Sequence, residues 1–571
     1  MTPPLSRIRR ATARVTALLP ARADLADVRR APGRDLLAGL TVAIVALPLA
    51  LGFGVSSGLG AEAGLATAVV AGLLAAVFGG SNLQVSGPTG AMTVVLVPIV
   101  AEHGPAGVLT VGLMAGVMLV ALAALRAGKY MRYVPAPVVE GFTLGIACVI
   151  GLQQVPNALG VPRPDGDHVL AVTWRAVREF ADHPDWTAVG LAVAVAAVML
   201  AGARWRPGVP FSIVAVVAAT VVAQTADLRA ARPIGDLPAG LPAPSLGFLD
   251  VGALGTLLAP AVAVAALAAL ESLLSASVAD GMTVGQQHDP DRELFGQGLA
   301  NIAAPLFGGV PATGAIARTA VNVRTGASSR LSALTHAVVL AVIVFAAAPL
   351  VERIPLAALA GVLLATAVRM VEVGSLRAMA RATRSDALIL VLTAVATLVL
   401  DLVYAVITGL VVATVLALRA VAQQVRIDQV PLDRGDHSAE EHALLAEHIV
   451  AYRIDGPLFF AAAHRFLLEL AEVADVRVVI LRMSRVSTMD ATGALVLKDA
   501  VEKLARRGIL VLASGIRPGQ RQVLDSVGAL DPLRHDGREF ATTPEAIRRA
   551  RAHLELTDVL PPAGSPAEAA R

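Results

Sequence analysis

Two short apolar segments of this chain each follow a turn rich in glycine and proline. The first turn is Gly-Pro-Thr-Gly at residues 87–90, and the apolar run after it is shorter than the roughly 20 residues that a helix needs to cross a bilayer. The second segment is GGVPATGAIARTAVN at residues 308–322. A helix that begins inside a membrane presents unpaired N–H groups and a positive dipole end, which together can hold an anion. Two interrupted helices in matching positions of two halves indicate the binding site of an inverted-repeat transporter.

An acidic side chain interrupts a later apolar run. Glu271 follows the sequence APAVAVAALAAL, where an ionised carboxylate costs at least about 2.5 kcal/mol. Because burial favours the neutral acid, a carboxyl group that is alternately wet and dry can take up and release a proton near neutral pH. Glu271 is therefore predicted to couple or gate transport, and the alternative is a carboxylate that pairs permanently with Arg318 as a brace.

Three further polar side chains lie in these segments. Arg318 cannot lose its proton and would attract an anion to the helix N-termini; alternatively, it satisfies Glu271 or backbone carbonyls. The hydroxyl groups of Thr89 and Ser275 can bond an oxyanion or an ion. Each hydroxyl could equally cap a helix or bond back to its own helix.

The composition indicates a polytopic membrane protein. Of the 571 residues 56% are hydrophobic and 16% are charged, and the mean hydropathy of +0.69 excludes an ordinary soluble domain. The net charge of +3 does not indicate nucleic-acid binding, and the single cysteine, Cys148, excludes an internal disulfide and a Cys-based metal site. The polar loop that contains His288 lacks metal-ligand spacing, and no cofactor is predicted.

About fourteen apolar spans are predicted, at 36–59, 62–80, 86–101, 107–126, 136–155, 186–203, 209–225, 254–279, 294–308, 314–323, 332–350, 355–370, 386–401 and 402–421. An even number places both termini on one side of the membrane. Arginine and lysine cluster before the first span and after the fourth, sixth and twelfth, which lie on that same side. The positive-inside rule therefore places both termini in the cytoplasm, with residues 1–34 as an extension.

Beyond about Arg426 the sequence changes character. Charged residues become frequent, and the strand-like runs HIVAYRID, VRVVILRM and GILVLASG alternate with helical patterns at Ala461–Val473 and Thr492–Arg507. This alternation predicts a soluble cytoplasmic α/β domain over residues 440–555. The Pro- and Ala-rich tail at 556–571 is predicted to be disordered.

Four motifs carry a family resemblance: GFTLGIACVIGLQQ at 141–154, ESLLSASVADGMT at 271–283, RELFGQGLANIAAPLFGGVPATGAIARTAVN at 292–322 and STMDATGAL at 487–495. Over roughly residues 30 to 550 the chain resembles the SulP anion transporters with a C-terminal STAS domain. Its membrane part looks more like the BicA-type bicarbonate transporters than the plant-like sulfate carriers. The resemblance implies a mostly α-helical membrane domain over residues 35–425, with seven plus seven inverted helices in a core and a gate domain, and usually a homodimer.

The resemblance also implies site residues. It puts substrate contacts at Thr89, Gly314, Ala315 and Ile316. Where the BicA type has an Asp and a Thr for sodium, this chain has Glu271 and Ser275, and a glutamate there is similar to the proton-coupled members. In phospho-switched STAS proteins a Ser follows an Asp, whereas Ala491 stands there in this chain, so Thr492 is either modified or an N-cap.

The function predicted from these residues is secondary active transport of a small inorganic oxyanion, sulfate or bicarbonate, across the plasma membrane, with proton coupling and no enzymatic activity. Sodium-coupled uptake of bicarbonate or a C4-dicarboxylate, a passive anion exchanger or channel, and a membrane-anchored sensor remain open. The predicted partners are the anion, a proton or sodium ion, the lipid bilayer and a second copy of the chain, with no nucleic acid.

Overall fold

The computed structural model describes residues 18–20, 28–164, 166, 168–206, 209–226, 232–235, 240–400, 402–423, 426–430, 447–459, 476–534 and 537–557. The chain divides into two compact units, residues 1–413 and 414–571, and each is described by itself. The predicted helix Ala461–Val473 and nearly all of the predicted tail lie outside the described residues, as do the first seventeen residues of the predicted extension.

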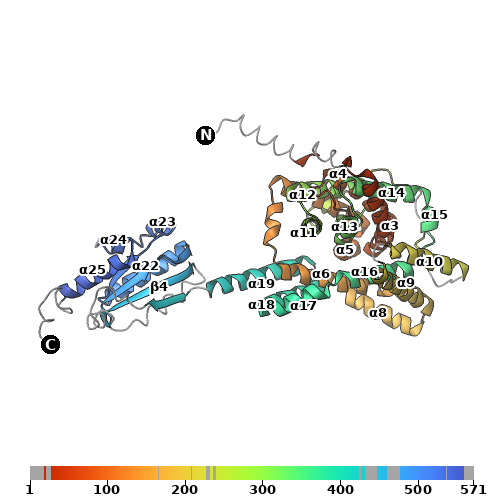
Figure 1. Ribbon diagram of the computed structural model, residues 1–571. Coiled ribbons are helices and arrows are strands. Elements are labelled where there is room, and N and C mark those ends of the chain that lie inside the picture. Colours follow the sequence, from red (N-terminus) through yellow and green to blue (C-terminus); the bar gives the residue numbers. More distant parts are fainter. Residues whose placement is uncertain are drawn as a thin grey trace. The chain divides into compact units, whose positions relative to one another are not determined.

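The first unit is helical (Figure 1). One order of elements occurs in it twice. Two helices, a two-residue strand and a further helix follow one another as α3 (Pro32–Ser57), α4 (Ala61–Phe78), β1 (Ser86–Gly87) and α5 (Gly90–Ala124). The same order returns as α11 (Leu258–Met282), α12 (Pro290–Leu306), β2 (Thr313–Gly314) and α13 (Ile316–Arg324). The two interrupted helices expected from the sequence are thus confirmed, and they occupy matching places in the two halves.

The remaining helices of the unit complete each half. The first half continues with η1 (Gly128–Tyr133), α6 (Ala136–Gln153), α7 (Val155–Ala158), α8 (Val169–Asp182), α9 (Trp186–Trp205) and α10 (Phe211–Thr225). The second half begins with η2 (Val251–Ala253) and continues after α13 with α14 (Leu331–Ala346), α15 (Ala348–Val351), α16 (Leu356–Met370), α17 (Val373–Ala382) and α18 (Arg384–Val399). The next helix, α19 (Leu402–Ala422), begins in this unit and continues past residue 413 into the second. The sequence reading missed α8, which lies between two predicted spans.

Within the described residues, seven helical segments are long and apolar enough to cross a bilayer: Pro32–Ser57, Ala61–Phe78, Gly90–Ala124, Ala136–Gln153, Trp186–Trp205, Leu258–Met282 and Leu356–Ala382. Shorter apolar helices occupy Phe211–Thr225, Leu331–Ala346 and Ile407–Ala422. The unit is therefore a multi-helix membrane domain, and the count of about fourteen spans stays a prediction.

Helix α5 consists of two arms. Gly104 interrupts it with φ of 67°, a left-handed conformation that suits glycine, and Pro105 follows at once. A proline ring clashes with the preceding helical turn, so the second arm starts a new direction. The two arms correspond to the predicted spans 86–101 and 107–126.

The connection from α4 to β1 is irregular and buried. Irregular backbone at membrane depth is tolerated where protein groups satisfy its N–H and C=O groups. Here side chains of other helices supply the partners: Glu293 accepts from the N–H groups of Gly80 (2.8 Å) and Ser81 (3.2 Å), Thr319 accepts from Val85 N (3.1 Å), and Asn322 donates to Leu83 O (2.8 Å).

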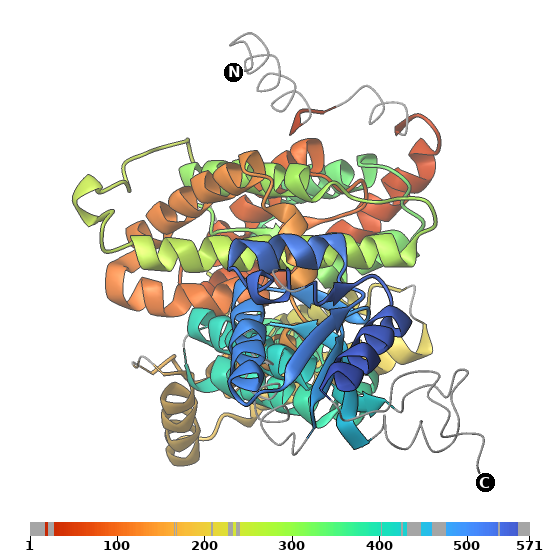
Figure 2. The ribbon, with the colours of Figure 1, turned by 90° about the vertical axis from the view of Figure 1, so that its left-hand side faces the viewer.

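The second unit is an α/β domain, whose helices α22, α23, α24 and α25 are labelled in Figure 1 and whose sheet is seen from another side in Figure 2. Its strands are β3 (Arg426–Val430), β4 (Ile449–Leu458), β5 (Val478–Arg482), β6 (Val486–Met489), β7 (Leu510–Ser514) and β8 (Glu539–Phe540), in the order β3-β4-β5-β7-β8 with β6 beside β4. The helices are α22 (Ala491–Arg506), α23 (Pro518–Ser526), α24 (Asp531–Arg534) and α25 (Thr543–Leu556).

Alternate residues of β5 explain how the sheet is covered. Val479 and Leu481 pack in one apolar cluster with side chains of α22, whereas Val478 and Ile480 pack in another with side chains of α25. Successive strand residues point to opposite faces, so both faces of the sheet are buried. The cap of α22 differs from the expectation: Asp490, not Thr492, is the N-cap, and its side chain accepts from Gly493 N at 2.7 Å.

Candidate functional site

The two interrupted helices meet at a two-residue antiparallel bridge. β1 pairs with β2 so that Ser86 lies opposite Gly314 and Gly87 opposite Thr313. Helix α5 begins immediately after β1 with Thr89 as its N-cap, and α13 begins after β2 with Ala315 as its N-cap. The N-termini of both helices therefore start from one place inside the domain, although they are far apart in the sequence.

Glu271 of α11 joins the two sides of this bridge. Its Oε2 atom accepts a hydrogen bond from Thr89 Oγ1 at 2.8 Å and another from Thr313 Oγ1 at 2.7 Å. The two hydroxyl oxygens lie 3.2 Å apart, with Thr313 placed to donate to Thr89 as well. Thr89 and Thr313 are buried, whereas Glu271 is only partly buried. One carboxylate thus contacts the N-cap hydroxyl of α5 and a hydroxyl of β2, the strand that precedes α13.

Arg318 is buried and reaches from α13 to the turn before α5. Its Nη2 atom donates to the carbonyl oxygen of Pro88, whereas Nη1 has no hydrogen-bond partner among the described residues. A side chain on Gly87 would place its Cβ 2.5 Å from Nη1, so the glycine leaves room for the guanidinium. Among the described residues no ion pair joins Arg318 to Glu271, and the contact made is the one with a backbone carbonyl that the sequence left open as an alternative.

The predicted substrate-contacting backbone around Gly314 is partly occupied by protein groups. Gly314 N donates to Ser272 Oγ at 2.9 Å, and Ala315 N donates to Val85 O at 2.9 Å. No side chain caps α13, so the N–H groups of its first turn, which begins at Ile316, stay without a capping side chain. The N–H groups of Gly314 and Ala315 thus already have partners within the protein, and the anion contacts predicted for Gly314, Ala315 and Ile316 stay predictions.

Ser275 does not share a cluster with Glu271. It is fully buried, and its hydroxyl lies 2.9 Å from Thr319 Oγ1. Because Thr319 also accepts from Val85 N, Ser275 supports the connection before β1 rather than the carboxylate. No hydrogen bond joins Ser275 to Glu271 among the described residues, and their pairing as a coupling-ion site stays a prediction.

The sequence reading missed two hydroxyl groups of the site, Thr313 and Ser272. Thr313 directly precedes Gly314 in the glycine-rich motif, and Ser272 directly follows Glu271, so adjacency to the chosen residues was the available signal. Both are buried and bonded within the bridge region.

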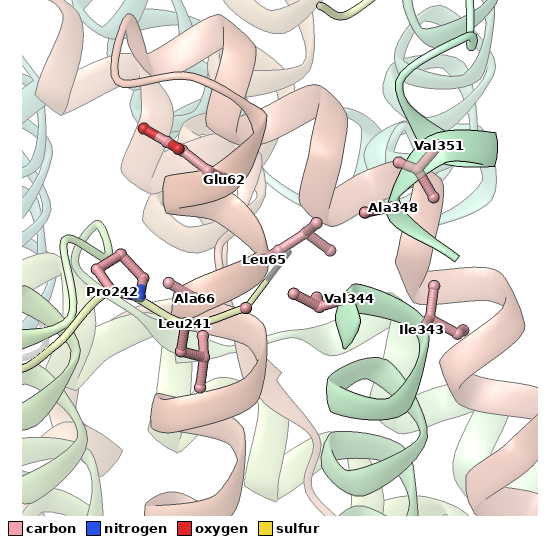
Figure 3. Close-up of a pocket in the computed structure, with 10 residues that line it drawn as sticks. Glu62, Leu65, Ala66, Leu241, Pro242, Ile343, Val344, Ala348 and Val351 are labelled. Atoms are coloured by element: carbon pink, nitrogen blue, oxygen red, sulfur yellow. The ribbon is translucent and has the colours of Figure 1, made fainter. Parts of the chain in front are cut away.

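An apolar pocket and a polar loop lie elsewhere in the first unit. The apolar pocket between α4, α14, α15 and residues 240–242 has one charged lining residue, Glu62, and nothing that would attract an anion (Figure 3).

The polar loop between α11 and α12 contains His288, whose ring nitrogen Nδ1 lies 2.7 Å from the Asp280 carboxylate of α11. Asp289 caps α12, and Asp291 of α12 accepts a hydrogen bond from Gly128 N. The described residues hold no group of three or more His, Cys, Asp or Glu that could bind a metal ion.

The helical membrane domain holds two interrupted helices that meet beside a carboxylate, and an α/β domain follows it. This is the architecture of a membrane transporter. The chain matches the sulfate permease family over residues 33–393 and the STAS domain over residues 443–546. It belongs to the sulfate permease family, the SulP anion transporters, and is a transporter rather than an enzyme.

Relatives that match most of the length of the chain support this family assignment. The chain is 36% identical over 505 residues to the putative sulfate transporter YvdB of Bacillus subtilis (strain 168), covering 87% of this chain and 93% of that protein. It is 34% identical over 499 residues to the bicarbonate transporter BicA of Synechocystis sp., covering 84% of this chain and 88% of that protein.

Solved structures agree as well. The transmembrane domain of a cyanobacterium bicarbonate transporter BicA matches 67% of this chain and 98% of that chain, with a TM-score of 0.59 and 34% identity. Murine Slc26a9, an anion transporter in the inward-facing state, matches 95% of each chain with a TM-score of 0.83 at 17% identity, which is a likeness of fold.

Proposed function

We propose that this protein is a secondary active transporter that moves a small inorganic oxyanion, sulfate or bicarbonate, across the plasma membrane together with a proton. The supporting observation is that one oxygen atom of Glu271 accepts hydrogen bonds from Thr89, the N-cap of α5, and from Thr313 in β2, which leads into α13. The names of the similar proteins, a putative sulfate transporter and a bicarbonate transporter, support this choice of anion class.

The proposed coupling follows from the chemistry of that carboxyl group. When Glu271 is ionised, it accepts the hydroxyl protons of Thr89 and Thr313, and its negative charge opposes an anion at the nearby helix N-termini. When Glu271 is protonated, the repulsion is removed and one hydroxyl becomes free to turn toward the anion. Proton and anion binding therefore favour each other, and by linkage the effect is reciprocal.

The alternating-access step belongs to the same proposal. Helix α11, which carries Glu271, packs against both α5 and α13, and the bridge between β1 and β2 joins the starts of these two helices, so these elements would move together in alternating access. Sodium coupling is less well supported, because this chain has Glu271 and Ser275 where the BicA type has an Asp and a Thr for sodium. A passive exchanger or channel would need no titrating acid beside the helix N-termini.

The membrane arrangement completes the proposal. The arginine and lysine residues that follow the fourth, sixth and twelfth predicted spans favour a cytoplasmic location for both termini and for the STAS domain. A homodimer is proposed from the family resemblance.

Uptake by the purified full chain in sealed proteoliposomes tests the function. With sulfate, bicarbonate and the C4-dicarboxylate succinate offered separately, we expect accumulation of sulfate or bicarbonate above the outside concentration under an inward proton gradient. A proton ionophore should abolish the accumulation. Flux that only equilibrates the anion would instead identify a passive exchanger or channel, and binding without flux would identify a sensor.

A further inference from the structure

One face of α12 carries a row of buried polar side chains. Glu293, Gln297 and Asn301 are spaced four residues apart, so they lie above one another on the same side of the helix. At most 1% of each residue is exposed. Helix α12 lies against α4 and α5, and its polar row faces the two irregular connections that lead into β1 and β2.

The first two members of the row hold the connection that leads into β1. Glu293 accepts four hydrogen bonds, from Gly80 N, Ser81 N, Gln84 Nε2 and Gln297 Nε2, at 2.8, 3.2, 2.8 and 2.9 Å. Gln297 also donates to Ser86 Oγ at 2.6 Å. A carboxylate with four donors is well satisfied inside the protein, and here it fixes the backbone up to the first residue of the bridge.

The third member holds the connection that leads into β2. Asn301 Oδ1 accepts from Ala312 N at 2.8 Å, and Asn301 Nδ2 donates to Ala312 O at 2.9 Å. One amide side chain thus satisfies both backbone groups of a residue that belongs to no helix or strand. The next residue along the chain is Thr313, whose hydroxyl donates to Glu271.

We propose that the polar row of α12 is the template that sets the register of the two half-helices, and that Asn301 is a positioning residue that holds Thr313 against Glu271 through Ala312. This inference rests on the proposed function for its coupling consequence, because Glu271 is the proposed proton carrier. Its structural part, that Asn301 fixes residues 312–316, stands on the contacts alone. Neither Asn301 nor Ala312 is proposed to touch the anion, so Asn301 acts only through the backbone that it holds.

The test compares three single variants and one double variant in the full chain. Asn301→Leu removes both bonds to Ala312, Asn301→Asp keeps the shape and the bond from Ala312 N, and Thr313→Val removes the hydroxyl at the far end. The matched control is Gln154→Leu, which removes another buried amide outside the bridge region. The Gln154 amide donates to Ser56 Oγ, and the two atoms are 2.9 Å apart. The readouts are amide hydrogen exchange of residues 312–316 and the ratio of protons to anions taken up.

Asn301→Leu should raise hydrogen exchange at residues 312–316 by about tenfold or more, since it removes both side-chain partners of the Ala312 backbone. It should also lower the proton-to-anion ratio, Asn301→Asp should have a smaller effect, and Gln154→Leu should change neither readout. If Asn301 acts through Thr313, the effect of the double variant Asn301→Leu/Thr313→Val on the ratio should equal that of the larger single variant rather than their sum.

Additive effects on the ratio, or unchanged hydrogen exchange in both Asn301 variants, would overturn the inference. Equal changes in both readouts for Gln154→Leu would also overturn it, because the effect would then follow from the loss of any buried amide and not of Asn301 in particular. If Asn301→Leu does not fold, Asn301→Asp carries the comparison. A wild-type chain that transports neither sulfate nor bicarbonate would contradict the proposed function alone, since the hydrogen-exchange comparison needs no transport.

Discussion

At the scale of single residues, the proposed coupling depends on the Glu271 carboxylate, which lies between two hydroxyl groups. One oxygen atom of Glu271 accepts hydrogen bonds from Thr89 Oγ1 and Thr313 Oγ1, which ties the start of α5 to the start of β2. The amide of glutamine has nearly the same shape as this carboxyl group and can accept the same two bonds, but it carries no titrating proton. The two roles of the residue, holding hydroxyls and carrying charge, can therefore be separated by one substitution.

Glu271→Gln should retain anion binding and lose its dependence on pH. The neutral amide imitates the protonated acid, so sulfate affinity at high pH should match that of the wild type at low pH. Calorimetric titration of the purified protein with sulfate and with bicarbonate across pH 5 to 8 would measure this. An affinity that still varies with pH in the variant as it does in the wild type would exclude Glu271 as the titrating group.

Thr89→Val should weaken anion binding moderately. One hydroxyl contributes about 0.5–1.5 kcal/mol net, so the dissociation constant should rise by about two- to tenfold. Thr89→Ser is the control, because serine keeps the hydroxyl that bonds Glu271 and accepts from Met92 N. Equal losses in both variants, measured by the same titration, would show that the methyl group and not the hydroxyl matters.

At the scale of elements, the bridge between β1 and β2 depends on small residues that let side chains cross. Arg318 lies where a Cβ on Gly87 would be, and Gln84 Nε2 lies where a Cβ on Gly314 would be. An acidic residue at position 314 would therefore introduce a clash as well as a charge. A variant that tests charge at the bridge therefore has to be compared with a variant that changes only the size of a side chain.

Gly87→Ala should displace the Arg318 guanidinium and thereby weaken anion binding. The new methyl group would stand 2.5 Å from Nη1, so the arginine must move off the Pro88 carbonyl. Gly151→Ala in α6 is a matched control, because nothing lies within 4 Å of a Cβ there. We expect a lower melting temperature and lower sulfate affinity in Gly87→Ala only. Unchanged affinity in a folded Gly87→Ala variant would show that the position of Arg318 does not matter for the anion.

The positions of the interrupted helices could be predicted because glycine and proline act locally. Gly104 with Pro105 breaks α5 where the apolar pattern pauses, and the turn at Gly87 precedes a helix as its composition suggests. The direction of the Arg318 side chain and the partner of Ser275 were beyond prediction, since both depend on which distant segments pack together. The row Glu293, Gln297 and Asn301 could have been found, because its spacing of four is visible in RELFGQGLANI.

At the scale of the whole molecule, the site and the STAS domain belong to different compact units. Every residue placed in the site precedes Asn322, whereas the second unit begins at Thr414 and has its own apolar clusters around its sheet. The alternation of strands and helices after Arg426 was predictable from short apolar runs separated by charged segments.

Deletion of residues from 440 onward should leave a membrane domain that binds anion with unchanged affinity. Its melting temperature should fall if the STAS domain stabilises a dimer, and size-exclusion chromatography with light scattering would show the change in mass. Calorimetric titration with sulfate and bicarbonate measures the affinity. A folded truncation that bound neither anion would assign the STAS domain a part in binding.

Flux into proteoliposomes under imposed gradients shows whether a proton carried by Glu271 drives anion uptake. Wild-type protein and Glu271→Gln would be compared with an inward proton gradient, with an inward sodium gradient at fixed pH, and with neither. The account predicts that sulfate or bicarbonate flux through the wild type rises with the proton gradient and ignores sodium, and that Glu271→Gln binds anion without accumulating it. Sodium-driven flux at fixed pH, or full accumulation by Glu271→Gln, would contradict it.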